Sequence, residues 1–185
     1  EIGHNLGWGH SGTLGSKYND MSGIMGYSFA QSDGPKLCTN GAKFWKTNWY
    51  GNRYHIINDV SLDKELRSFN YTGTLTSFNN DPLVTGPPMI IKVATDTNMT
   101  YFVGYNGKTE SNSGATSLDT VNVYSVEDEE MYGSSSILHA TLSAGESFHA
   151  LIGISLNVTV LSIDDAAGEA MIDVSSSTTV FTRGS

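Results

Sequence analysis

The pattern of hydrophobic and polar residues changes near residue 65. Beyond it, short runs rich in Val, Ile, Thr, Tyr and Phe are separated by Gly, Asn, Asp and Ser, which is the pattern of strands and turns. Val158 and Val160 alternate with Asn157 and Thr159, so one face of this strand is apolar. The predicted strands are residues 66–78, 89–95, 100–105, 120–126, 136–142, 148–154, 157–163, 170–174 and 178–182. Many short strands without intervening helices indicate a β-sandwich over this part of the chain.

The first 65 residues combine glycine-rich loops with two helical segments. Residues 1–6 have the pattern of a helix end, and Gly7 supplies the left-handed conformation that often terminates a helix. A second helix is predicted to begin at Thr39 or Asn40, either of which can cap it, and to continue through Trp49. Its aromatic residues have helical spacing, which favours packing in the core over lining a cleft.

Composition and charge exclude two classes of partner. With 19 acidic against 10 basic side chains the formal net charge is -9, which repels the phosphates of nucleic acid. The longest weakly apolar stretch, residues 148–163, is interrupted by polar residues and cannot supply the roughly 20 apolar residues of a membrane span.

Three N-x-S/T sequons, at Asn70, Asn98 and Asn157, are compatible with a secretory route. The single cysteine, Cys38, is expected as a buried thiol or as the partner of a cysteine upstream.

The chain opens on the run EIGHNLGWGH, which matches E-x-x-H-x-x-G-x-x-H at every fixed position. A helix brings positions four apart onto one face, so a histidine just before Glu1 would direct its ring where His4 does. The turn at Gly7 then lets His10 approach from outside the helix. Three neutral imidazoles around zinc leave the fourth position for water, and a nearby carboxylate can accept a proton from that water. The pattern therefore predicts a catalytic zinc site with His4 and His10 as ligands and Glu1 as general base.

The motif and the later run SGIMGY together resemble the metzincin zinc peptidases, whose long histidine motif is followed by a methionine-containing turn. In that motif the first histidine would precede Glu1, so we expect the chain to be a fragment that lacks this ligand. The resemblance implies that Met25 packs beneath the metal without ligating it. It also implies that Tyr27 reaches the zinc or the developing oxyanion. The alternative for Tyr27 is a core tyrosine with a satisfied hydroxyl.

The resemblance is to the gametolysin-like family in particular. It rests on the runs HSG at residues 10–12, IMGY at residues 24–27 and CTNGAKFW at residues 38–45. It implies an α+β fold in which residues 1–65 form the C-terminal part of a metzincin catalytic domain. Residues 66–185 then form a separate β-sandwich-like domain.

These observations lead to one leading expectation and one alternative. We expect a secreted, monomeric zinc endopeptidase that hydrolyses peptide bonds of extracellular proteins, cell-wall glycoproteins among them, through a zinc-bound water. The alternative is an extracellular β-sandwich module for binding or adhesion, with a non-catalytic metzincin remnant. With only His4, His10 and Tyr27 as ligands, the isolated chain is expected to bind zinc weakly and to lack peptidase activity.

Overall fold

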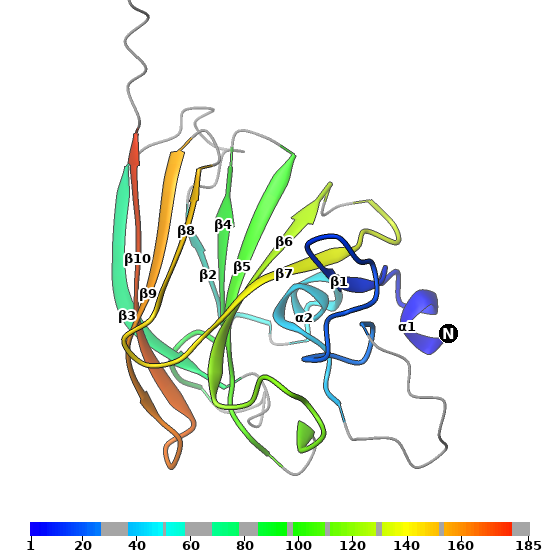
Figure 1. Ribbon diagram of the computed structural model, residues 1–185, viewed down its shortest axis with the longest axis horizontal. Coiled ribbons are helices and arrows are strands. Elements are labelled where there is room, and N and C mark those ends of the chain that lie inside the picture. The colour runs from blue at the N-terminus through cyan, green and yellow to red at the C-terminus, as the bar shows by residue number, and fades with distance from the viewer. Residues whose placement is uncertain are drawn as a thin grey trace, which may run out of the picture.

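A computed structural model of the chain describes residues 1–26, 37–49, 51–57, 68–77, 85–95, 98–109, 112–128, 131–151 and 154–178. These residues form two short helices and ten strands (Figure 1). The helices are α1 (Ile2–Asn5) and α2 (Gly41–Thr47). The strands are β1 (Ser11–Thr13), β2 (Tyr54–Ile57), β3 (Phe69–Thr76), β4 (Ile90–Ala94), β5 (Met99–Asn106), β6 (Thr120–Glu127), β7 (Ser136–Leu142), β8 (Ser147–Leu151), β9 (Ile154–Asp164) and β10 (Glu169–Thr178).

The strands form two sheets that lie face to face (Figure 1). Sheet A has six strands in the order β1-β7-β6-β5-β4-β2, and sheet B has four in the order β3-β10-β9-β8. All neighbouring strands are antiparallel except β1 with β7 and β2 with β4, which are parallel. The helices lie on the side of sheet A that faces away from sheet B (Figure 1).

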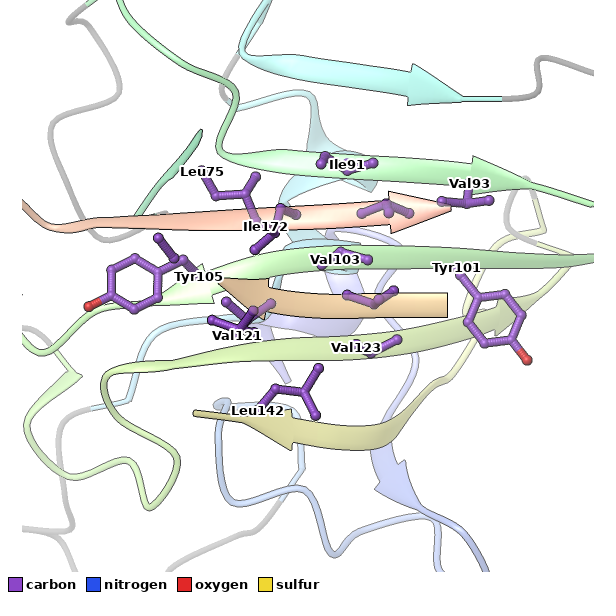
Figure 2. Packing of buried hydrophobic residues seen from close by; sticks show 14 of the residues in the cluster. Leu75, Ile91, Val93, Tyr101, Val103, Tyr105, Val121, Val123, Leu142 and Ile172 are labelled. Carbon is purple, nitrogen blue, oxygen red and sulfur yellow. The ribbon is translucent and has the colours of Figure 1, made fainter. Parts of the chain in front are cut away.

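The main hydrophobic core fills the space between the two sheets. Figure 2 shows Val103, Val121 and Val123 of sheet A meeting Leu75 and Ile172 of sheet B, and all five side chains are fully buried. The alternation of side chains along each strand directs this apolar set to one face. Burial of each such side chain contributes about 1.5–3 kcal/mol, so this contact is the main source of stability of the sandwich.

A second core lies between α2 and the opposite face of sheet A. Phe44 of α2 packs in one cluster with Ile90, Phe102 and Tyr124. Asn40 caps the start of the helix, because its side chain accepts a hydrogen bond of 3.2 Å from the Lys43 amide. Asn40 was one of the two caps predicted from the sequence. The helix ends at Thr47, two residues before the predicted end at Trp49. Sheet A is therefore covered on both faces.

The predicted α+β fold class is wrong, and the chain is all-β. Its two described helices have four and seven residues, and the segment expected to be part of a metzincin catalytic domain supplies two strands of sheet A. Strand β1 pairs with β7, and strand β2 pairs with β4. These short strands depend on partners distant in the chain, so the local pattern did not reveal them. The predicted boundary near residue 65 lies outside the described residues.

The strand predictions for the remainder are confirmed. Each strand from β3 to β10 overlaps a predicted one, and β7 has the predicted bounds. The last predicted strand, residues 178–182, lies outside the described residues except for Thr178. Within the described residues, neither helix has the length and apolar character needed to cross a membrane.

Candidate functional site

The histidine motif lies on α1 and the tight turn that follows it, at the edge of the molecule beside β1 (Figure 1). The helix ends because Gly7 adopts a left-handed conformation, with φ of 79°, as predicted. The Gly7 and Trp8 amides donate hydrogen bonds to the carbonyls of His4 and Gly3, both at 3.0 Å. This turn sends the chain back past the helix, and His10 follows it directly.

The turn brings the two histidines together. The ring centroids of His4 and His10 are 4.8 Å apart and the ring planes are nearly perpendicular, at 88°. With Zn–N bonds of about 2.0 Å, two imidazoles at a tetrahedral angle place their ring centroids roughly 5 Å apart. The separation of the rings therefore fits two ligands of one zinc ion.

The orientation of the His4 ring is held by the backbone. Its Nδ1 lies 2.8 Å from the carbonyl oxygen of Trp8. Because a carbonyl oxygen can only accept, Nδ1 is the donor, and Nε2 of the neutral ring keeps its lone pair. A metal-ligating histidine commonly donates its other N–H in this way, which sets the tautomer and the direction of the ring. The hydroxyl of Tyr132, in the loop between β6 and β7, donates a hydrogen bond of 2.6 Å to the His4 carbonyl and also anchors this residue.

The surroundings of His10 favour its neutral form. Burial lowers the pKa of His10, and the nearby His4, Lys43 and Lys17 lower it further. A metal ligand must be deprotonated, so a lowered pKa extends the range in which the ring can bind a metal. The ring of Tyr18 packs against His10 with its centroid 4.4 Å away, and this side chain is half exposed. No sequence pattern indicated Tyr18, because a residue in an irregular loop has no periodic signal.

Met25 packs against the helix that carries His4. A side-chain carbon added at Gly3 would collide with the Met25 sulfur and come within 2.9 Å of the Trp8 ring. The carbonyl of Met25 accepts a hydrogen bond of 2.8 Å from the amide of Ser11, the residue after His10. Met25 therefore contacts both segments that carry the histidines, while its place relative to a metal stays a prediction.

Glu1 and Tyr27 are the two predicted catalytic residues. Glu1 precedes α1, is exposed, and makes no capping hydrogen bond with its side chain. Tyr27 lies outside the described residues. Within the part of the chain that the structure describes, no group of three or more His, Cys, Asp or Glu side chains could hold a metal ion. The described residues thus bring two imidazoles together at a separation compatible with zinc, and every zinc ligand stays a prediction.

An open, mainly apolar groove of about 770 Å³ is lined in part by residues of α1. Its lining includes Gly3, Trp8, Met25, Cys38 and Trp49. Burial raises the pKa of the Cys38 thiol, so the thiol keeps its proton at neutral pH. The Trp49 ring contacts Trp8 edge-on and is half exposed, whereas Trp45 packs in the second core.

Comparisons of the chain with models of known protein families, with curated proteins and with solved structures return no match. The fold places the chain among all-β sandwich proteins, and the histidine pair defines the candidate site. The resemblance to gametolysin-like metzincins stays a prediction from the motif.

Proposed function

We propose that the chain carries part of the active site of a zinc-dependent endopeptidase. The observation that carries the proposal is the pair formed by His4 and His10, with rings 4.8 Å apart and the His4 tautomer set by the Trp8 carbonyl. When bound, zinc supplies Lewis acidity that makes water a nucleophile near neutral pH. In this proposal His4 and His10 hold the metal through neutral imidazole nitrogens.

Glu1 is the proposed general base. Its carboxylate makes no capping hydrogen bond and is exposed at the start of the helix that carries His4, so it is not committed to a structural role there. A carboxylate within hydrogen-bond reach of the reacting water accepts its proton and passes it to the leaving amine. Tyr27 is proposed to donate to the oxyanion. Secretion, a monomeric state and a protein or peptide substrate, cell-wall glycoproteins among them, belong to the same proposal.

The proposal is tested by supplying the third imidazole that the motif calls for. One histidine added ahead of Glu1 should strengthen zinc binding, measured by competition with a chromogenic chelator, by at least about tenfold over an alanine added at that place. His4→Ala and His10→Ala should each abolish the gain, while His55→Ala, which changes a ring packed on Tyr71, should keep it. In the histidine-extended chain, Glu1→Gln should keep zinc and lose about 10²–10⁴-fold in peptide hydrolysis.

Two results would count against the proposal. Equal zinc affinity of the histidine and alanine extensions would show that His4 and His10 do not form a zinc site. Unchanged hydrolysis in Glu1→Gln would refute the role of Glu1 alone and leave the two ligands in place.

A further inference from the structure

A fully buried carboxylate, Asp20, lies in the loop between β1 and α2. Its two oxygens accept hydrogen bonds from the Ser11 hydroxyl, from the Ser22 hydroxyl and amide, and from the side-chain amide of Asn40. The hydrogen bond from the Ser22 backbone amide measures 2.9 Å, and the longer one from the Asn40 side-chain amide measures 3.4 Å. A buried charge is costly unless its hydrogen-bonding capacity is satisfied, and these four donors satisfy it.

Two of the donor residues, Ser11 and Ser22, come from the segments that build the candidate site. Ser11 directly follows His10, and its amide donates to the carbonyl of Met25. Ser22 lies three residues before Met25 in the same turn. The backbone of that turn also packs closely against Asp20, because a side-chain carbon at Gly26 would collide with the Asp20 carbonyl. One carboxylate thus joins the strand after His10 to the turn that carries Met25.

The same network is anchored in sheet A. The Ser11 hydroxyl lies 2.9 Å from the hydroxyl of Ser136 on β7, and the Ser22 hydroxyl lies 2.6 Å from that of Tyr124 on β6. The Asn40 side chain bonds both serines of the first pair, at 2.8 Å to Ser11 and 3.0 Å to Ser136. Ser11, Ser136 and Tyr124 are all fully buried. Side chains locked to central strands of a packed sheet hold their positions better than side chains on a free loop.

We propose that Asp20 is a positioning residue for the zinc site and that it keeps His10 and Met25 in place relative to His4. This inference rests on the proposed function. Asp20 touches neither histidine ring in the described contacts and acts through Ser11 and Ser22. Every partner of its oxygens donates, so an amide in place of the carboxylate would direct an N–H at one of these donors. The isosteric change Asp20→Asn therefore breaks the network without changing its volume.

The test compares Asp20→Asn with Val158→Ala, a change in the sandwich core that lowers stability without touching the network. Amide hydrogen exchange at Ser11 is measured on the full chain. The affinity for Co²⁺ is measured from its visible absorption on the full chain extended by one histidine ahead of Glu1. Each variant is measured at the same number of degrees below its own melting temperature. Under these conditions the Ser11 amide should exchange at least about tenfold faster in Asp20→Asn than in Val158→Ala. Loss of a group hydrogen-bonded directly to a metal ligand weakens metal affinity by about 10–100-fold. Asp20 acts on the ligands through Ser11 and Ser22, so the Co²⁺ affinity should fall by up to that factor.

A second variant keeps the test decisive if Asp20→Asn does not fold. Ser22→Ala retains the carboxylate but removes one donor and the bond to Tyr124, and it should speed Ser11 exchange in the same direction by a smaller factor. Ser11 exchange and Co²⁺ affinity equal to those of Val158→Ala would overturn the positioning role. Absence of Co²⁺ binding in the histidine-extended chain and all its variants would contradict the proposed zinc site, and Ser11 exchange would still decide whether Asp20 holds the strand after His10.

Discussion

At the scale of single residues, the histidine motif depends on contacts that tolerate few changes. Gly3 shows this most clearly, because it lies one residue before His4 and has Met25 and Trp8 packed directly on its α-carbon. Trp8 is almost fully buried, so its ring has little room to move. A side chain at this position would push Met25 away from the helix.

The prediction for Gly3 has a matched control in the other helix. Gly3→Ala should lower the free energy of unfolding by about 1–3 kcal/mol through overpacking. Gly41→Ala should raise it by up to about 1 kcal/mol, because the new carbon would lie 3.5 Å from Ile90, at ordinary contact distance, and alanine favours the helix. Chemical denaturation measures both. Equal stabilities of the two variants would contradict the packing of Met25 against Gly3.

At the scale of elements, α2 is attached to the rest of the chain by a buried cation. The ammonium of Lys43 donates to the carbonyls of Ser134 and His10, at 3.1 and 3.4 Å. Burial lowers the pKa of Lys43 to about 8, although the charge of Asp20 acts in the opposite direction. In the unfolded chain the amine keeps its ordinary, higher pKa, so between pH 8 and 10 the unfolded state binds more protons than the folded one.

This difference predicts how stability depends on pH. The free energy of unfolding should rise from pH 8 to pH 10 in the parent by about 2 kcal/mol more than in Lys43→Met, which cannot titrate there. Comparing the two proteins cancels the opposite contribution of the buried tyrosines, whose pKa values are raised. Denaturant midpoints at pH 8, 9 and 10 give the measurement. Parallel pH profiles would show that the Lys43 ammonium is not buried.

At the scale of the whole molecule, stability resides in the two-sheet core. Strand β9 offers a direct comparison, because Leu156 is fully buried between the sheets while Leu161 is 47% exposed. Leu156→Ala should cost about 2–5 kcal/mol of unfolding free energy, and Leu161→Ala should change it by no more than about 0.5 kcal/mol. Thermal or denaturant unfolding distinguishes the two. A larger loss for Leu161→Ala would mean that the faces of sheet B are assigned the wrong way round.

The sequence determined those features whose causes are local. Alternation around Val158 and Val160 predicted a strand and its buried face, Asn40 predicted the start of α2, and the spacing from His4 to His10 with Gly7 between them predicted that the rings meet. Each of these depends on neighbours within a few residues, where backbone geometry sets what can touch.

Only the tertiary structure decided the fold class and the surroundings of the site. Strand β1, with the sequence Ser-Gly-Thr, has no apolar alternation and exists because Ser11 pairs with Ser136, 125 residues along the chain. In the sequence Asp20 has no feature that separates it from other loop residues. Only the fold surrounds its carboxylate with Ser11, Ser22 and Asn40. Pairing of distant strands and satisfaction of a buried charge depend on contacts that no local window of sequence contains.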